Sequence, residues 1–227
     1  MIHFSKQSGM KKTESLVEVI MAIFVVAMGS AVATSLIVSA LQSNAFSRDN
    51  LIALNLAIEG VEAVRSIRDA NWVKFSYDKA GCWNMRPEVT DCKDPTAKQI
   101  AQGNYTIDVN LSPNDYRWAI PNASLPAILD LNVSGNGNDP YQLWYYDINA
   151  ADGAGSHDIL ASLSSSGATK NDESRFYRMI QINYPATGLP ADQEMDVIST
   201  VQWKAQGVTH QVVLTSKLTN YQKVKVK

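Results

Sequence analysis

The stretch that decides the fold runs from Leu16 to Leu41 and reads LVEVIMAIFVVAMGSAVATSLIVSAL. Its only charged residue is Glu18, and a run of about 20 mainly apolar residues is long enough to cross a bilayer as a helix. The leader before it, MIHFSKQSGMKK, holds Lys6, Lys11 and Lys12 and no acid. By the positive-inside rule, this places the amino terminus in the cytoplasm and the rest of the chain outside. The apolar run is too long for the core of a cleaved secretory signal, so we expect a single-pass membrane protein.

Glu18 allows two interpretations. An ionisable residue inside a membrane helix is by default a candidate for function. Ser15 and Glu18 also match a capping box, in which the glutamate side chain accepts a hydrogen bond from a free backbone N–H at the helix start. The spacing alone leaves both interpretations open.

The helical pattern continues through residues 48–72. One face carries apolar residues at spacings of three and four and is expected to meet a core; these are Leu51, Leu54, Ile58, Val61 and Val64. The opposite face is polar, with Asn55, Glu59, Glu62, Ser66 and Asp69. No proline occurs between Thr13 and Trp72, which predicts one helix of about 58 residues, roughly 87 Å long at 1.5 Å per residue.

The chain after this helix changes to the period of β-strands. Residues 105–111 alternate between apolar and polar side chains, and residues 141–148 and 175–184 are rich in aromatic side chains. Two further strands flank a turn at Gln206 and Gly207. Segments rich in Asn, Asp, Gly and Ser are expected to be loops; they are 134–140, 149–156 and 162–174.

A helix followed by antiparallel strands predicts an α+β fold, in which a long amino-terminal helix packs on an antiparallel β-sheet. The expected order is a basic leader at 1–13, an apolar membrane-spanning helix at 14–47, an amphipathic continuation at 48–72, and an exported β-rich head at 73–227.

Composition offers little material for catalysis or for nucleic-acid binding. The 227 residues carry a formal net charge of -2, whereas nucleic-acid binding calls for a basic footprint. His3, His157 and His210 are the only histidines. The sequence shows no metal-ligand cluster, phosphate loop or nucleophile elbow. We therefore expect no enzymatic activity, no cofactor and no metal site.

Two weaker motifs favour ordinary interpretations. Residues 147–153 read DINAADG and are similar to part of a calcium loop, but Ala151 stands where an EF-hand needs an oxygen ligand. A solvated turn is the favoured interpretation. Sequons for N-glycosylation begin at Asn104, Asn122 and Asn132, and three such sequons arise readily by chance in a polar chain.

Cys82 and Cys92 enclose the segment GCWNMRPEVTDC on the expected exported side, where disulfides persist. We therefore expect a bridge rather than two free thiols. Closing a loop of this size stabilises a fold by roughly 3 kcal/mol in the chain-entropy model.

The amino-terminal residues also resemble a known family. A short basic leader followed by ESLVEVIMAIFVVAMGSA, with a lone glutamate near the start of the apolar helix, is similar to the class III signal of type IV pilins and type II secretion pseudopilins. The stretches NLAIEGVEAVRSIRDANW and VQWKAQGVTHQVVLTSKLTNY are also similar to minor pilins and pseudopilins.

The resemblance implies a filament subunit. In the family, a prepilin peptidase cuts before the apolar segment and often methylates the new amine, and the processed subunits stack helix against helix on an inner-membrane assembly platform. The family's glutamate, fifth in the processed chain, corresponds to Glu18, which places the cut between Thr13 and Glu14. The family usually has glycine before the cut and an aromatic or aliphatic residue after it, so this chain departs from the pattern at both positions.

The implied partners are other pilin or pseudopilin subunits, the peptidase, the platform and membrane lipid. The implied final location is an extracellular or envelope filament. The residues themselves leave one alternative open: a permanently anchored bitopic surface protein with an adhesive or sensory head.

Overall fold

The computed structural model describes residues 16–93, 98–112, 115–121, 124–125, 141–147, 158–161, 169–185 and 193–220. Helix α1 spans Leu16–Lys74 and runs for 59 residues without a break, so the predicted long helix is confirmed. The chain divides into two compact units, Met1–Arg48 and Asp49–Lys227, and the second is called the head unit below. In the described part of the chain, α1 is the one helix long and apolar enough to cross a membrane.

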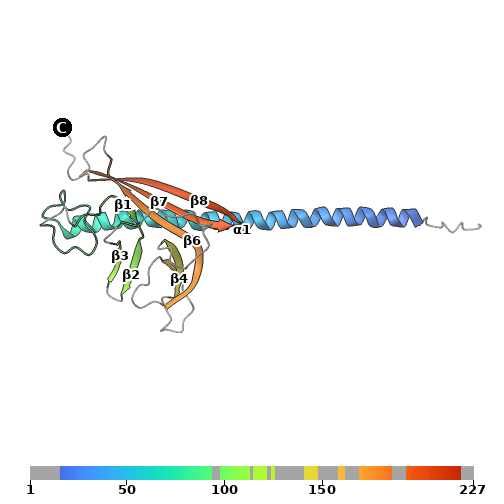
Figure 1. Cartoon of the computed structure of the whole chain (residues 1–227), viewed down its shortest axis with the longest axis horizontal. Coiled ribbons are helices and arrows are strands. Elements are labelled where there is room, and N and C mark those ends of the chain that lie inside the picture. The colour runs from blue at the N-terminus through green and yellow to red at the C-terminus, as the bar shows by residue number, and fades with distance from the viewer. Residues whose placement is uncertain are drawn as a thin grey trace, which may run out of the picture. The chain divides into compact units, whose positions relative to one another are not determined.

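Eight strands follow α1 within the described ranges. Their bounds are β1 Gly103–Tyr105, β2 Asp108–Ser112, β3 Asp115–Ala119, β4 Gln142–Asp147, β5 Asp158–Ala161, β6 Thr169–Asn183, β7 Glu194–Ala205 and β8 Val208–Thr219. The larger sheet has the order β5-β4-β6-β7-β8, with β1 also paired to β6, and β2 pairs with β3 in a separate sheet. All these pairings are antiparallel, which confirms the predicted α+β class. Figure 1 shows the long strands β6, β7 and β8 beside α1.

Strands β7 and β8 form the hairpin that the sequence pattern predicts. β7 and β8 pair along their whole length, from Glu194↔Thr219 to Ala205↔Val208. Gln206 and Gly207 connect them with φ values of 51° and 79°. A two-residue hairpin turn with positive φ at both positions matches the right-handed twist of the flanking strands. The predicted turn and its two strands are therefore confirmed.

The alternating segment 105–111 forms two strands instead of the single strand that its pattern predicts. β1 pairs with β6 and β2 pairs with β3, so the chain leaves one sheet for another between them. Thr106 and Ile107, which separate them, are both buried. The Ile107 carbonyl oxygen accepts a hydrogen bond of 2.8 Å from Arg178 Nη2. The side chains of Thr106 and Ile107 are therefore buried in the head unit although neither residue belongs to β1 or β2.

β6 is longer than its sequence suggests, because it begins at Thr169 inside the predicted loop 162–174. β4 pairs with the first part of β6, and β1 pairs with Ile180–Ile182 near its end. Thr169, Lys170 and Glu173 pair with β4 through the backbone, so the strand extends into this polar stretch whatever its side chains are. The predicted loops 134–140 and 149–156 lie outside the described residues.

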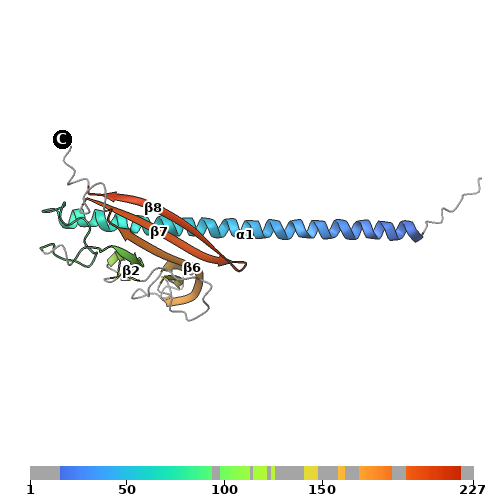
Figure 2. The same cartoon turned by 45° about the horizontal axis from the view of Figure 1, so that its top comes forward.

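The core of the head unit lies between the sheet and the carboxy-terminal part of α1. Figure 2 shows β6, β7 and β8 running along that part of the helix. The helix contributes mainly small side chains to one core cluster, with Ala53, Leu56 and Ala57, and the sheet contributes large ones, with Phe176 and Trp203. A second cluster continues the same interface through Val61, Ala63, Val64 and Ile67.

The predicted core stripe of α1 is therefore partly wrong. Val61 and Val64 are buried as expected, whereas Leu51, Leu54 and Ile58 are exposed. The face that packs on the sheet is the one with alanine and glycine, because small residues let the helix backbone approach the bulky side chains of the strands. The polar face from Asn55 to Asp69 lies away from the core, as predicted.

Candidate functional site

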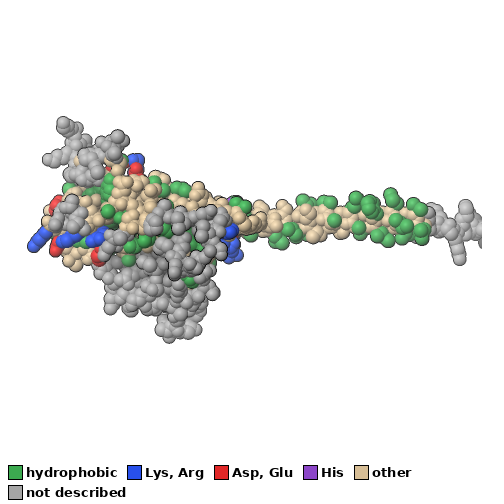
Figure 3. All heavy atoms as spheres, viewed as in Figure 1, with side chains coloured by type: hydrophobic (Ala, Val, Ile, Leu, Met, Phe, Trp, Pro, Cys, Tyr) green, Lys and Arg blue, Asp and Glu red, His purple; other side chains and the backbone are tan. Residues whose placement is uncertain are grey.

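The first candidate surface is the part of α1 that belongs to the amino-terminal unit. Every residue from Leu16 to Arg48 is exposed, and large apolar side chains project on all sides of the helix. Figure 3 shows these apolar side chains along the visible face. The hydroxyl groups of Ser30 and Thr34 donate to the carbonyls of Ala27 and Ser30 at 2.9 and 2.8 Å. The helix thus satisfies these polar groups internally, which suits an apolar environment.

Glu18 lies in the first turn of α1 and is exposed. It is the only charged residue between Leu16 and Ser47. A carboxylate in the first turn is favoured by the helix dipole, since the free N–H groups there carry partial positive charge. Thr13, Glu14 and Ser15 lie outside the described residues, so the proposed cut and the capping box both stay predictions.

The second candidate surface is one stripe of α1 in the head unit, which we call the outer stripe. Its residues follow one another at spacings of three and four and therefore share a helix face: they are Leu51, Leu54, Ile58, Glu62, Arg65, Asp69 and Val73. At the start of the stripe, Leu51, Leu54 and Ile58 are 61%, 38% and 42% exposed. At its end, Val73 is 81% exposed.

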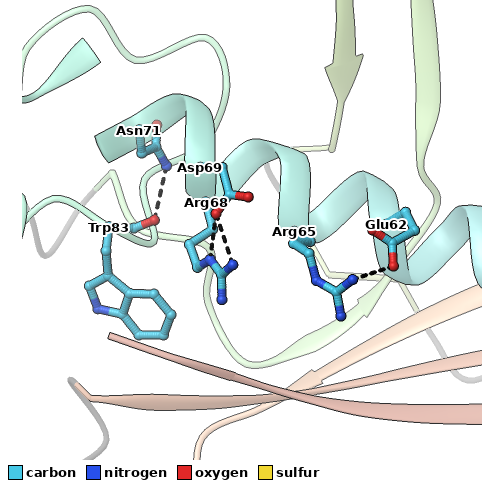
Figure 4. Close-up of polar contacts among 6 residues, drawn as sticks. All are labelled: Glu62, Arg65, Arg68, Asp69, Asn71 and Trp83. Carbon is cyan, nitrogen blue, oxygen red and sulfur yellow. Dashed lines mark hydrogen bonds and ion pairs between the residues drawn. The ribbon is translucent and has the colours of Figure 1, made fainter. Parts of the chain in front are cut away.

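Charged residues occupy the middle of the outer stripe, between its two apolar ends. Figure 4 shows Arg65 paired with Glu62, and Arg68 reaching Asp69 with an Nη2–Oδ1 distance of 2.8 Å. Arg68 also stacks on the ring of Trp72, with its Cζ 4.6 Å from the ring centroid. The side chains of Glu62 and Asp69 are each 51% exposed, and ion pairs with so much contact with water add little stability.

Two arginines of β6 hold α1 in the rotation that exposes this stripe. Arg178 is fully buried; its Nη1 lies 3.0 Å from a carboxylate oxygen of Glu59 and also donates to the Leu56 carbonyl at 3.4 Å. Arg175 Nη1 lies 2.8 Å from the buried carboxylate of Asp49. In each pair one partner is buried, and removal of the more exposed partner would leave that buried charge without compensation. These contacts therefore resist any rotation of the helix on the sheet.

The predicted bridge between Cys82 and Cys92 is present, with an S–S distance of 2.05 Å. Both cysteines pack in a small cluster with Phe75, Met85 and Val89. The Lys98 ammonium donates a hydrogen bond to the Asp91 carboxylate beside the bridge and lowers the pKa of that carboxyl below its usual value.

Polar contacts tie this bridged loop to the rest of the head unit. Asn71 Nδ2, near the end of α1, donates to the carbonyls of Trp83 and Met85 at 3.2 and 2.7 Å (Figure 4 draws the first). Asn84 Nδ2 donates to the Tyr184 hydroxyl at 3.0 Å, and that hydroxyl donates to the Ile100 carbonyl at 2.6 Å. Burial raises the pKa of Tyr184 to about 12.

The remaining motifs show no chemistry in the described residues. His210 lies beside Trp203 with ring centroids 5.5 Å apart, which agrees with a structural role. The Asn104 amide reaches the Leu125 carbonyl at 3.5 Å. His3, His157, Asn122, Asn132 and the segment 148–153 lie outside the described residues. Within the part of the chain that the structure describes, no group of three or more His, Cys, Asp or Glu side chains is placed to hold a metal ion.

Sequence reasoning missed the outer stripe and the two arginines that orient it. The pattern that marks the buried face was present, because Ala53, Ala57, Gly60 and Val64 recur at spacings of three and four. For Arg178 the signal is strand alternation, which sets it on one face of β6 with Phe176, Ile180 and Ile182. No protein-family model, curated protein or solved structure matches this chain.

Proposed function

We propose that this chain is a membrane-anchored structural subunit of a filament, of the minor pilin or pseudopilin kind found in type IV pili and type II secretion systems. The observation that carries the proposal is the apolar half of α1, which is exposed on every side and has Glu18 in its first turn. Apolar surface of this extent needs lipid or protein to cover it. A filament subunit uses both in turn: lipid before assembly and neighbouring helices after it.

Glu18 has a chemical role in this proposal. A carboxylate in an apolar setting costs free energy unless it meets a positive group or a donor. The new α-amine of a neighbouring subunit, made when the prepilin peptidase cuts between Thr13 and Glu14, would supply that group. Glu14 stands four residues before Glu18 and repels it across one helix face. The pairing should therefore be weaker than in a subunit with an uncharged first residue.

The proposal places the amino terminus in the cytoplasm and the head outside the membrane, in agreement with the lysines of the leader. Partners would be other pilin or pseudopilin subunits, the peptidase and the inner-membrane assembly platform. The work of the subunit would be assembly rather than catalysis. A permanently anchored bitopic protein is the second candidate, because lipid alone would also cover the exposed apolar helix.

The ratio of filament-bound to membrane-bound protein separates the two candidates. We expect Glu18→Leu and Glu18→Gln to insert normally but to lower this ratio by about tenfold, which corresponds to a loss of about 1.4 kcal/mol per subunit. The measurement is quantification of the head in sheared filaments and in membranes. Full assembly of Glu18→Leu would exclude the intersubunit role of Glu18. Wild-type protein that never leaves the membrane would favour the permanent anchor.

A further inference from the structure

Strand β8 forms one edge of the larger sheet. Among the described strands it pairs with β7 alone, in a register that continues without a bulge from Val208 to Thr219. Its 12 residues include no proline and one charged side chain, that of Lys217. Proteins usually protect a long edge strand with charges, proline or a bulge, because its free N–H and C=O groups can pair with another strand. Within the described residues, the outer edge of β8 lacks this protection.

The hairpin turn fixes which backbone groups face the outer edge. In a two-residue hairpin the pair that closes the turn is hydrogen-bonded, and hydrogen-bonded pairs then alternate along the ladder. Here that closing pair is Ala205 and Val208. The N–H and C=O groups of the even-numbered residues of β8 therefore point to β7, and those of the odd-numbered residues point to the outer edge. The side chains of the odd-numbered residues from 211 to 217 are also exposed.

The polarity of β8 reads the same in both directions from Val213. On each side of Val213 come one apolar residue, three polar residues and one apolar residue. Two antiparallel β8 strands centred on Val213 would therefore match apolar with apolar and polar with polar side chains at every position. The matched pairs are Val212 with Leu214, Gln211 with Thr215, His210 with Ser216, Thr209 with Lys217, and Val208 with Leu218.

We propose that the outer edge of β8 binds β8 of a second copy of the chain, in antiparallel orientation and with a two-fold axis at Val213. The contact joins the two sheets into one and pairs the outward N–H and C=O groups of both edges. An interface of this kind is self-complementary, because the same strand lies on both sides of the axis. This inference goes beyond the filament function and does not rest on it.

Other registers of the same pair match less well. The outward backbone groups belong to odd-numbered residues, so the axis can move only in steps of one residue, which shifts each pairing by two. An axis at Val212 would set Leu214 on His210, and an axis at Leu214 would set Val212 on Ser216. Each places apolar side chains on polar ones, and cross-strand pairs are the unit of sheet stabilisation. The axis at Val213 avoids these mismatches.

Charge also permits the contact at Val213. Like charges directly opposite each other on two strands destabilise a sheet. In this register Lys217, the one charged residue of β8, faces the uncharged Thr209 of the second copy. Its own sheet already compensates it, since Lys217 Nζ donates to Glu194 and lies 3.1 Å from Asp196 Oδ1.

The direction of β8 decides how the two copies are related. Val212 packs against the cluster that contains Ala53, whereas Leu218 belongs to the cluster that contains Ile67, so β8 and α1 run in the same direction along the head unit (Figure 2). The two-fold axis therefore sets the α1 segments of the paired head units antiparallel. Subunits within one filament would share a direction, so the contact suits two filaments that lie side by side in opposite directions.

Charges placed at the axis test the contact. The side chain of Val213 is 51% exposed, so its replacement leaves the core intact. We expect the full chain in detergent to form a dimer by sedimentation analysis. Val213→Lys and Val213→Glu should each give several-fold less dimer, because like charges then face each other across the axis, and a mixture of the two should restore it. The matched control Gln202→Lys, on β7, should dimerise as the wild type does.

Cysteine variants test the register. The native cysteines are bridged, so an added cysteine is the free thiol. Val213→Cys alone should oxidise to a covalent dimer, because Cα atoms of a hydrogen-bonded pair lie about 5.5 Å apart, within reach of a disulfide. Gln211→Cys alone should not, since its two copies would lie four residues apart, about 14 Å along the strand. Gln211→Cys mixed with Thr215→Cys should cross-link.

Three results would overturn the proposal. They are a monomeric wild-type chain in detergent, dimers that Val213→Lys leaves unchanged, and a Val213→Lys and Val213→Glu mixture with no more dimer than either variant alone. Cross-linking of Gln211→Cys by itself at the level of Val213→Cys would exclude the register. None of these measurements requires a filament, so failure of the filament function would leave their outcome unchanged.

Discussion

At Gly60, a Cβ atom added to α1 would lie 2.5 Å from Ile180 Cδ1 and 2.7 Å from Ser199 Oγ. Both neighbours are completely buried in strands of the sheet. The absence of a side chain at this one position lets the helix backbone approach the strands. Next to it, Arg178 crosses the interface and binds Glu59. The close approach at Gly60 and the ion pair of the buried Arg178 together set the face that α1 turns outward.

Gly60→Val should therefore destabilise the head unit. Overpacking of a filled core costs about 1–3 kcal/mol, which exceeds the gain of a few tenths that valine offers over glycine in a helix. The measurement is thermal unfolding of the full chain in detergent, followed by near-ultraviolet circular dichroism. Gly29→Val is the matched control, since nothing lies within 4 Å of a Cβ there. An unchanged midpoint for Gly60→Val would contradict close packing at this position.

Tyr184 should make the unfolding free energy of the head unit fall at alkaline pH. Its folded-state pKa of about 12 lies above the value of 10.0 expected in the unfolded chain. The folded state thus holds the proton more tightly, so this contribution to stability is complete below pH 10 and is lost as the pH rises toward 12. Tyr184→Phe should have a lower stability at neutral pH but a shallower decline over this range. Urea unfolding at several pH values measures both, and an identical decline in the two proteins would contradict the assignment.

At the scale of elements, a bridged loop closes the carboxy-terminal end of α1. Asn71 of the helix donates two hydrogen bonds to the loop backbone, and the Cys82–Cys92 bridge lies on the cluster around Phe75. The loop thus packs against the last turns of the helix on the side of Asn71. Val73, two residues further along, is exposed. The bridge, the hydrogen bonds of Asn71 and the contact of Asn84 with Tyr184 together hold this loop in place.

Removal of the bridge should increase local opening mainly in this loop. The double variant Cys82→Ala, Cys92→Ala should lose about 3 kcal/mol of unfolding free energy, because the constraint acts mainly on the unfolded chain. Hydrogen exchange should rise in residues 82–92 more than in β7 and β8. Alkylation of the unreduced wild-type protein should label neither cysteine. Ready labelling without reductant would show that the bridge does not form in the cell.

At the scale of the whole molecule, processing of the leader is the first step toward the proposed filament. We expect the mature protein to begin at Glu14, lighter by residues 1–13. The Thr13→Gly variant should be cut faster, since glycine is the residue that the resemblance to prepilins implies before the cut. Amino-terminal sequencing and intact mass of protein from the native cell test this. Assembled filaments whose subunits still begin at Met1 would show that cleavage is not required.

The long helix, the carboxy-terminal hairpin and the bridge could all be predicted from the residues alone, because each depends on a local pattern. An uninterrupted apolar run specifies α1, the Gln206–Gly207 pair suits a tight turn, and the two cysteines stand close together in the chain. The tertiary structure decided which face of α1 is buried. Leucine and isoleucine at 51, 54 and 58 predict a core stripe, but the large side chains of the strands pack on the face that carries Ala53, Ala57 and Gly60.

The break between β1 and β2 was also decided by tertiary contacts. Arg178, 71 residues away in sequence, donates a hydrogen bond to the Ile107 carbonyl. In a continuous strand that carbonyl would accept a bond from a neighbouring strand instead. Periodicity reports which side chains are apolar, whereas it carries no information on what a distant strand will place against them. The exposure of the outer stripe follows from that second kind of information.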